Sequence, residues 1–362
     1  DATLPDEHRS RNNQLLWHAM AQVEPALFAA CRCFGPDRIG VVLGTSTSGV
    51  DENLPAFRHI ADGGQWQDSA FSQAHQLLCS PVDFVQAQYG LSGIGYAIST
   101  ACTSGARALA SAARLLKLGL CDAVLCGGVD SLSLLTINGF ASLEVVSGRV
   151  ARPFAADREG INIGEAAAVF LMTRAPMPGF PEGEPIGLLG YGASSDAWHM
   201  SSPRPDGEGA MQAIQAALQG AGLSAGDLGW INLHGTGTAQ NDAMESLAVV
   251  QTLGVDVPGT STKPHTGHTL GAAGALEAAI VWGFVSRQLN PSGALPAQGN
   301  ERDPSLAPLR LTRPGDCWPS GPRLGLSTSF AFGGNNMALI IGSNTHRDVL
   351  RDHIALIIGD TA

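Results

Sequence analysis

Four residues of this sequence have side chains and neighbours that suit nucleophilic catalysis: Cys102, His234, Lys263 and His268. A thiolate can attack an electrophilic carbon, while imidazole groups move protons or donate hydrogen bonds to a developing negative charge. Taken singly, each residue also has an ordinary interpretation, because buried structural cysteines, core histidines and solvated loop lysines are common. Taken together, they form a nucleophile with stabilising groups around it.

The nucleophile candidate stands between two predicted elements. An extended run over 96–102 ends at Cys102, and residues 104–117 form an Ala- and Leu-rich segment that is small on nearly every face. Such a segment predicts a buried helix. We expect the head of this helix to lower the pKa of the Cys102 thiol, because the helix dipole and the free N–H groups favour the thiolate.

The other candidates lie in two loops of the second half. His234 ends a predicted strand and opens the run His234-Gly-Thr-Gly-Thr238. Lys263 and His268 lie in a polar loop before a second small-residue helix, predicted over 272–282. A buried lysine is costly unless it is paired, so the position of Lys263 at the head of an apolar helix indicates a functional role. For His265, in the same loop, a solvated position is the favoured interpretation.

Alternating strands and helices predict an α/β fold built from two similar halves. Short apolar strands closing on glycine are predicted over 38–44 and 122–129, and the order strand, loop, buried helix recurs in the second half. This order indicates duplication and mostly parallel sheets covered by helices. We assign residues 1–178 and 179–343 to the two halves, with a linker over 178–185, and leave 344–362 unassigned. A helix is predicted over 12–31, with a break or kink at Pro25.

Composition excludes several classes of protein. Of the 362 residues, 44% are hydrophobic, which argues against a disordered chain. The net charge of -11 argues against nucleic-acid binding, because a binder has to neutralise phosphate groups. Seven cysteines, an odd number in a long chain, argue against a disulfide framework, and the lone Cys31-x-Cys33 pair does not predict a metal site. No membrane-spanning stretch or signal peptide is predicted, which favours the cytoplasm.

Three blocks together resemble the signatures of the β-ketoacyl-acyl carrier protein synthases, in particular the elongating enzymes with a Cys-His-His set. The blocks are Thr100-Ala-Cys102-Thr-Ser-Gly105, His234-Gly-Thr-Gly-Thr238 and Ser261-Thr-Lys263-Pro-His-Thr-Gly-His268. Two further segments are similar to the family, Arg152 to Gly160 and Phe330 to Asn335. The resemblance runs from about residue 10 to about residue 343. The strand with which the family opens has no counterpart before residue 10, so the strand count of the first half stays open.

The resemblance implies the thiolase-like fold, five layers in the order α-β-α-β-α, and a homodimer or a related heterodimer. It implies that Cys102 takes an acyl chain from an acyl carrier protein and that malonyl-carrier then loses CO2 and attacks the thioester. It implies no bound cofactor, because phosphopantetheine arrives on the carrier protein. By the same resemblance, His234 and His268 donate hydrogen bonds to the enolate, and Lys263 orders the site and pairs with Glu277.

The resemblance also implies roles around the reacting groups. The backbone N–H groups of Cys102 and Phe332 would hold the oxyanion, and Phe332 would act as a gate that the glycines after it allow to move. Thr236 and Thr238 match positions that bind the pantetheine arm. Phe330 and Thr47 are expected to contact the substrate, Thr47 by lining the acyl pocket.

Two alternatives share the fold. One is a non-catalytic partner subunit of the chain-length-factor type, which usually lacks the cysteine or a histidine. The other is a thiolase, which has a second cysteine in a Cys-x-Gly block where this chain has Phe332-Gly-Gly. For the pathway, fatty acid elongation and a dedicated polyketide or aryl polyene pathway both fit, and the Thr45-Ser-Thr-Ser48 loop favours the specialised one.

Overall fold

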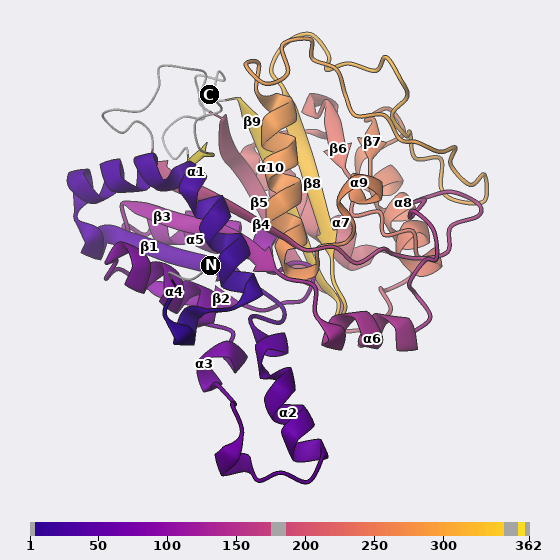
Figure 1. Cartoon of the computed structure of the whole chain (residues 1–362). Coiled ribbons are helices and arrows are strands. Elements are labelled where there is room, and N and C mark those ends of the chain that lie inside the picture. Colours follow the sequence, from indigo (N-terminus) through magenta and orange to yellow (C-terminus); the bar gives the residue numbers. More distant parts are fainter. Residues whose placement is uncertain (1–3, 175–185, 344–353, 359–362) are drawn as a thin grey trace.

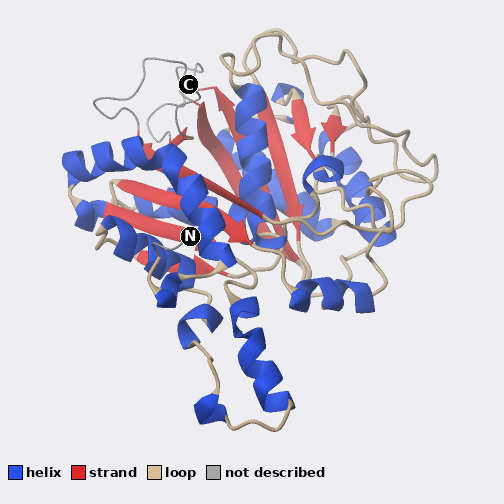
Figure 2. Ribbon diagram, in the orientation of Figure 1, coloured by secondary structure: helices blue, strands red, loops and turns tan. Residues whose placement is uncertain are grey.

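The computed structural model describes residues 4–174, 186–343 and 354–358 (Figures 1 and 2). The predicted linker over 178–185 lies outside these ranges, as do residues 344–353 and 359–362 of the unassigned tail. Two similar halves lie side by side, and α2 and α3 project from the first half as an arm (Figure 1).

The strands within the described residues belong to one continuous ten-stranded sheet with the order β2-β1-β3-β4-β10-β5-β9-β8-β6-β7. In each half, three parallel strands are followed by an antiparallel one: β4 pairs with β3, and β9 with β8. The strands are β1 (Ile39–Gly44), β2 (Gly95–Ile98), β3 (Ala123–Asp130), β4 (Ala166–Arg174), β5 (Ile186–Ser195), β6 (Trp230–Asn232), β7 (Gly259–Thr260), β8 (Leu324–Phe330), β9 (Asn335–Ser343) and β10 (Ile354–Ile357).

The helices make three layers around the sheet. On the outer side of the first half, α1 (Arg11–Phe34) and α4 (Ser80–Tyr89) pack against β1, β3 and β4, whereas α7 (Glu208–Ala221) and α8 (Ala239–Leu253) cover the second half. Between the halves, α5 (Ser104–Lys117) and α10 (Ala273–Val285) share one apolar core. The two halves of the sheet, β2-β1-β3-β4-β10 and β5-β9-β8-β6-β7, lie on either side of this central helix layer and so form two β layers. The expected five-layered α-β-α-β-α arrangement is therefore confirmed. The remaining helices are α2 (Leu54–Ala61), α3 (Gln73–Gln76), α6 (Leu134–Ser142), α9 (Lys263–Thr266), and the 3-10 helices η1 (Asp6–His8), η2 (Pro36–Arg38), η3 (Val50–Asn53), η4 (Trp66–Asp68), η5 (Ala225–Asp227) and η6 (Leu270–Ala272).

Close contact between the two central helices explains their small residues. A Cβ atom added at Gly105 would lie 2.8 Å from the backbone nitrogen of Ala275, and one added at Gly274 would lie 2.7 Å from the Cβ of Ala106. Such distances are shorter than real Cβ contacts, so glycine is required where α5 crosses α10. This approach brings the residues at the heads of the two helices together.

Of the two effects predicted for Pro25, a break or a kink, the break is not seen. Pro25 does not end α1, which continues from Arg11 to Phe34. The apolar face of α1 buries Leu16, Met20 and Leu27 completely, and this burial outweighs the hydrogen bond that proline removes.

The unassigned tail contributes a strand. Ile354–Ile357 form β10, which pairs antiparallel with β4 on one side and with β5 on the other. The second half has the same arrangement, with β5 antiparallel beside β9. The strand β10 beside β4 is therefore the counterpart, in the first half, of β5 beside β9. The indole N–H of Trp282 donates to the carbonyl of Leu356 at 3.1 Å, which ties β10 to the central layer.

No helix in the described ranges is long and apolar enough to cross a membrane. Nor does any group of three or more His, Cys, Asp or Glu side chains in these ranges lie close enough to hold a metal ion. The seven cysteines, all of them described, are free thiols.

Candidate active site

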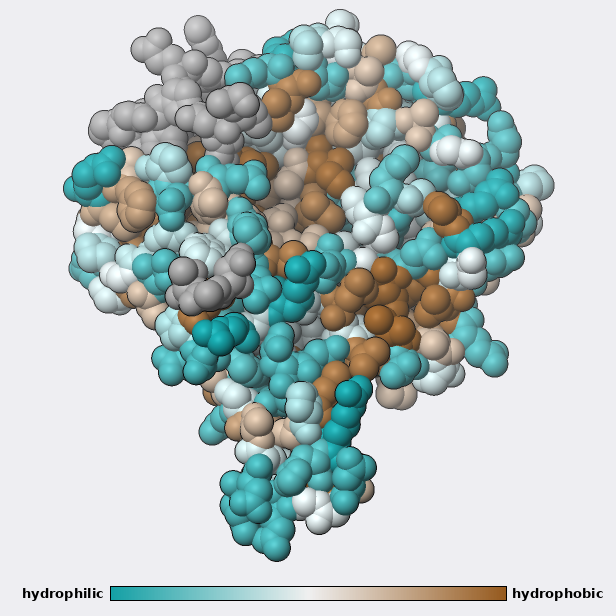
Figure 3. All heavy atoms as spheres, viewed as in Figure 1, coloured by the Kyte–Doolittle hydropathy of each residue, from teal (hydrophilic) through white to brown (hydrophobic). Residues whose placement is uncertain are grey.

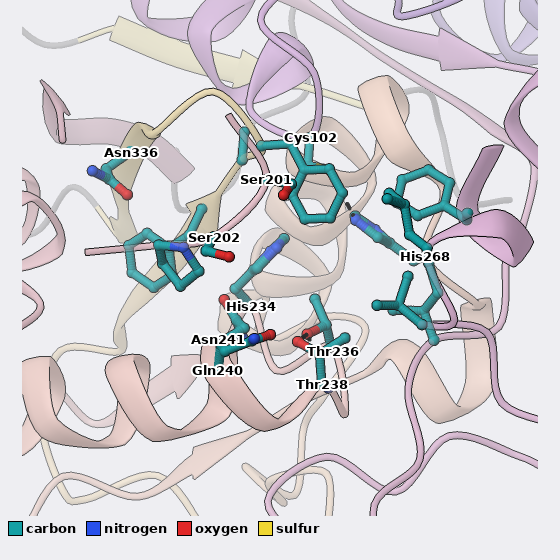
Figure 4. A pocket seen from close by; sticks show the side chains of 18 of the residues that line it. Cys102, Ser201, Ser202, His234, Thr236, Thr238, Gln240, Asn241, His268 and Asn336 are labelled. Atoms are coloured by element: carbon teal, nitrogen blue, oxygen red, sulfur yellow. Dashed lines mark hydrogen bonds between the residues drawn. The ribbon is translucent and has the colours of Figure 1, made fainter. Parts of the chain in front are cut away.

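A cavity lies where the two halves meet, at the head of α5 (Figure 4). Its empty volume is about 920 Å³, including the open mouth. Residues from both halves line it, among them Cys102, Phe140, Leu143, Ile161, Ser201, Ser202, His234, Thr236, Thr238, Gln240, Asn241, His268, Phe330, Phe332 and Asn336.

Cys102 lies in a tight turn between β2 and α5. Ala101 before it has a φ of 50°, which a non-glycine residue rarely adopts. The hydroxyl of Ser104 holds this turn, because it accepts from the N–H of Thr100 at 2.9 Å and donates to the carbonyl of Ala101 at 2.6 Å. The side chain of Cys102 thereby points into the cavity, although the residue is only 5% exposed.

The thiol of Cys102 contacts His268 directly. The distance from Sγ to the Nε2 of His268 is 3.0 Å (Figure 4). Burial raises the pKa of the thiol to about 12, and the positive charge of Lys263 and the N–H of Phe332 only partly oppose this effect. The sequence-based expectation of a lowered pKa is therefore wrong for the unloaded site. Because the resting group is a neutral thiol, its proton has to leave as it attacks, and His268 is the base within reach.

Lys263 fixes the orientation of His234. The buried ammonium lies 3.3 Å from the Nδ1 of His234, 2.5 Å from the carbonyl oxygen of His234 and 2.5 Å from the Oε1 of Glu277. An ammonium only donates, so Nδ1 accepts and the ring proton sits on Nε2, which faces the cavity. Burial and the charge of Lys263 hold the pKa of His234 well below its usual value, so the ring is a neutral hydrogen-bond donor.

His268 is held in a different way. Its backbone N–H donates to the carbonyl of Asn162 at 2.6 Å, and its own carbonyl accepts from the N–H of Gly164 at 3.0 Å. Its Nδ1 is buried and makes no hydrogen bond to the described residues. Burial and then the charge of Lys263 hold the pKa of His268 well below its usual value. Either nitrogen of this neutral ring can therefore carry the proton, which suits a group that exchanges protons with a thiol.

Two buried carboxyl groups that sequence reasoning missed support the loop of His234. Glu245 accepts from the N–H groups of His234 and Gly235, both at 2.7 Å, and Asp242 accepts from the N–H of Gly237 at 3.2 Å. Burial raises the pKa of Glu245 to about 7 and that of Asp242 to about 6. Their spacing of three residues on one face of α8, directly after the loop, is a signal that the sequence does contain.

Aromatic residues form another wall of the cavity. The ring of Phe330 meets His234 edge-on, with 5.9 Å between ring centres. Phe332 is partly exposed, its ring centre lies 5.5 Å from that of Phe140, and its N–H donates to the thiol of Cys102. Gly333 and Gly334 after it both have positive φ angles, 84° and 78°, which glycine adopts without strain.

The structure brings most of the predicted site residues together. Thr236 and Thr238 line the cavity, and their hydroxyls lie 2.9 Å apart. Glu277 does not line the cavity and accepts a hydrogen bond from Lys263, as predicted. Thr47 is not among the residues that line this cavity, and its predicted place in the acyl pocket stays a prediction. It lies in the loop after β1, with its N–H turned toward Asp130 at 3.3 Å.

A buried thiol paired with an imidazole, a second neutral imidazole donor and a fold of two similar α/β halves define a cysteine-dependent acyl-transfer enzyme of the thiolase-like class. The comparisons agree. Residues 14–176 match the family described as "Beta-ketoacyl synthase, N-terminal domain", and residues 187–293 match "Beta-ketoacyl synthase, C-terminal domain". The chain belongs to the β-ketoacyl synthase family.

Curated relatives give the activity. The chain is 33% identical to 3-oxoacyl-[acyl-carrier-protein] synthase 2 of Rhizobium meliloti, over 83% of this chain and 73% of the relative, and 32% identical to the enzyme of the same name from Synechocystis, over 84% and 74%. The chain is therefore a β-ketoacyl-acyl carrier protein synthase, of the class of acyltransferases that serve condensation in fatty acid or polyketide synthesis. The alternative of a thiolase is thereby set aside.

Solved structures give the fold in more detail. The chain is 44% identical, with a TM-score of 0.85, to a chain of "Ketosynthase (ApeO) in Complex with its Chain Length Factor (ApeC)" from Xenorhabdus doucetiae, over 94% of this chain and 84% of that one. A β-ketoacyl synthase from Burkholderia phymatum is 27% identical, with a TM-score of 0.79, over 95% and 85%.

Proposed function

We propose that this chain is the catalytic subunit of a ketosynthase that extends an acyl chain by decarboxylative Claisen condensation. The acyl chain waits as a thioester on Cys102, malonyl-acyl carrier protein is the extender, and the products are β-ketoacyl-acyl carrier protein and CO2. The observation that carries this proposal is the 3.0 Å contact of His268 with the thiol of Cys102, in a cavity that His234 also lines.

In the loading step, Cys102 attacks the thioester carbonyl of the acyl-carrier. His268 takes the thiol proton as the sulfur–carbon bond forms, and the tetrahedral oxyanion accepts hydrogen bonds from the N–H groups of Cys102 and Phe332. The intermediate collapses, the sulfur of the carrier leaves as a thiolate, and the proton returns from His268 to that sulfur. The balance is a thioester on Cys102 and a free thiol on the carrier.

In the condensation step, the malonyl group loses CO2, and the electrons of the broken carbon–carbon bond form a thioester enolate. The Nε2–H groups of His234 and His268 donate to the enolate oxygen, where negative charge develops. The enolate carbon attacks the acyl carbonyl on Cys102, and the Cys102 sulfur leaves. The Cys102 thiolate takes up one proton from solvent, relayed by the adjacent His268, which closes the cycle.

The carrier protein brings the only prosthetic group that the proposal needs. The phosphopantetheine arm is a substrate arm and not a resident cofactor of this chain. Thr236 and Thr238 lie on the cavity wall on the path to His234, and their hydroxyls suit the amides of such an arm. Phe332, with two glycines after it, is proposed to swing aside and admit each acyl group.

We also propose a second ketosynthase-fold chain as partner, either a related subunit or another copy. The strand β2 lies at the edge of the sheet, which offers a free hydrogen-bonding edge. Apolar side chains gather on the surface over α6 and its flanks (Figure 3): Leu132, Leu134, Leu135, Ile137, Leu143, Val146 and Val150. The similar complex of a ketosynthase with its chain length factor favours a related subunit.

The similarity to the complex of a ketosynthase with its chain length factor also favours a specialised pathway over primary fatty acid synthesis. The sequence of the Thr45-Ser-Thr-Ser48 loop favours the same pathway. Our proposal keeps the cytoplasmic location expected from the sequence. The second candidate function is a non-catalytic subunit of the chain-length-factor type, since one such subunit is present in the similar complex. The intact contact of Cys102 with His268 favours the catalytic role.

The experiment that tests the proposal is a condensation assay. The purified chain, alone and with a candidate partner, is mixed with acyl-carrier and malonyl-carrier proteins, and both CO2 and β-ketoacyl-carrier are measured. Formation of both products in equal amounts supports the proposal. Condensation that persists unchanged in Cys102→Ala, with the partner supplying the activity, would assign this chain the non-catalytic role.

A further inference from the structure

Asp130, at the carboxyl end of β3, is fully buried and collects hydrogen bonds from both halves of the fold. From the loop after β1, its Oδ1 accepts from the hydroxyl of Thr45 at 2.7 Å and from the N–H of Ser46 at 2.8 Å. From the turn before α10, its Oδ2 accepts from the N–H of Gly271 at 2.6 Å. The hydroxyl of Ser46 also donates to Oδ2. A carboxylate with several such donors is held in one orientation.

Both segments that Asp130 holds contain a non-glycine residue with a positive φ. Leu270, directly before Gly271, has a φ of 50°, and Ser48 has a φ of 53°. The N–H of Ser48 donates to the hydroxyl of Thr45, which itself donates to Asp130. Backbone strain of this kind persists only where the surrounding contacts over-determine it. The carboxylate of Asp130 supplies such contacts on both sides.

The turn held by Asp130 is the one that carries His268. Only Thr269 and the strained Leu270 separate His268 from Gly271. Gly271 lies so close to the carboxylate that an added Cβ atom would be 2.6 Å from Oδ2. The backbone of His268 is held on one side by Asn162 and Gly164, and this short link holds it on the other. Both matter for the place of the imidazole against Cys102, because the Nδ1 of His268 has no hydrogen bond to the described residues that could hold the ring.

We infer that Asp130 is a positioning residue: through the N–H of Gly271 it holds the turn that presents His268 to Cys102, and through the hydroxyl of Thr45 and the backbone N–H of Ser46 it fixes that turn to the first half. Asp130 itself touches no substrate in this account. The inference rests on the proposed function for its kinetic consequence, since His268 serves malonyl decarboxylation. Its structural consequence, the position of His268, can be measured without any carrier protein.

The variant Asp130→Asn separates the two links. Its side-chain oxygen can still accept from Thr45 and Ser46, but its amide nitrogen faces the N–H of Gly271 and cannot accept from it. We expect malonyl-carrier decarboxylation to fall roughly 10- to 100-fold, as for other small misplacements of a catalytic group. Acyl loading onto Cys102 should fall less, because a water molecule in the cavity can take the thiol proton in place of the displaced imidazole, whereas the lost donor to the enolate oxygen has no such replacement. Ser46→Ala is the matched control, because it removes another donor to the same oxygen and leaves Gly271 in place; its decarboxylation rate should stay within a few-fold of wild type.

Two further measurements separate positioning from general damage to the fold. The double variant Asp130→Asn/His268→Ala should decarboxylate no more slowly than His268→Ala alone, because the two changes remove the same contribution. In a crystal structure of Asp130→Asn, the Nε2 of His268 should lie beyond about 3.5 Å from Sγ of Cys102, which is outside hydrogen-bond distance.

The inference is overturned if Asp130→Asn keeps the contact of His268 with Cys102 and the wild-type decarboxylation rate. It is also overturned if both half-reactions fall equally while that contact is intact, which would indicate a merely structural role. A wild-type enzyme that neither loads nor condenses would refute the proposed function instead, and the crystal structure of the variant would still decide the role of Asp130.

Discussion

The Nε2 of His268 lies 3.0 Å from the Sγ of Cys102, although 166 positions separate the two residues in the chain. The contact joins the two halves of the molecule, because Cys102 precedes α5, His268 precedes α10, and these helices pack against each other in the central layer. The chemistry of this site therefore depends on how the two halves fit together.

Replacing His268 should divide the reaction into its two steps. In His268→Ala, decarboxylation of malonyl-carrier should fall roughly 100-fold or more, because the enolate oxygen loses one of two donors. Acylation of Cys102 should fall less and remain measurable, because water that enters the vacated space can take the thiol proton in place of the imidazole. Single-turnover assays of each half-reaction measure the two rates separately. The exposed His265 offers the control His265→Ala, which should leave both rates unchanged. Equal loss of both half-reactions in His268→Ala would sink this division of roles.

The buried pair of Lys263 and Glu277 should separate stability from catalysis. Lys263→Met leaves the Glu277 carboxylate without its partner, so the free energy of unfolding should fall by about 3–5 kcal/mol. In Lys263→Met/Glu277→Met both charges are gone, and most of that stability should return. Condensation should not return, because the Nδ1 of His234 still lacks the donor that sets its tautomer. Chemical denaturation and the condensation assay test this pair of outcomes; recovery of activity with stability would contradict the role of Lys263.

The buried carboxyl of Glu245 gives a pH dependence with a definite sign. Its pKa is raised to about 7 from an ordinary value near 4.5, so the folded protein binds this proton more tightly than the unfolded chain. The resulting stability is present below about pH 4.5 and is lost as the pH rises through about 7. Glu245→Gln cannot titrate. The free energy of unfolding of wild type minus that of Glu245→Gln should therefore be larger at pH 5 than at pH 8, measured by urea denaturation; a difference that is constant or grows with pH would contradict this.

The strand β10 should contribute to the stability of the whole fold. Leu356 is buried and its carbonyl accepts from Trp282, so Leu356→Ala should lower the free energy of unfolding by about 2–5 kcal/mol, the usual range for such a cavity in a core. The neighbouring Ala355 is only half-buried, and Ala355→Ser serves as the control. Thermal and chemical unfolding of the two variants compare them. Equal stability of Leu356→Ala and Ala355→Ser would show that β10 does not pack as described.

The sequence predicts the elements around the site well, for a physical reason. A strand that closes on glycine and a helix of small residues leave a local pattern, so the helix over 104–117 is found at the same bounds. The pairing of Lys263 with Glu277, which the resemblance implied, is a contact in the structure. Residue types alone could indicate this pairing, because the charge of Glu277 on the apolar helix α10 needs a partner of opposite sign.

Other features depend on the tertiary structure and could not be found from the sequence. The thiol pKa is one: a helix N-terminus is visible in the sequence, but the complete burial of Cys102 that outweighs it is not. Asp130 is another, because its partners Thr45 and Gly271 lie far away in the chain. The positive φ of Leu270 also has no signature, since leucine normally avoids that region.

The measurement that tests the central claim most directly is the intact mass of the protein after incubation with acyl-carrier proteins and then with malonyl-carrier. We expect one acyl mass on the wild-type chain, mapped to Cys102 by peptide analysis, present also in Cys317→Ala and absent in Cys102→Ala. Addition of malonyl-carrier should remove that mass and yield β-ketoacyl-carrier. A chain that takes no acyl group from any carrier, with or without a partner subunit, would contradict the assignment of Cys102 as the nucleophile of a condensing enzyme.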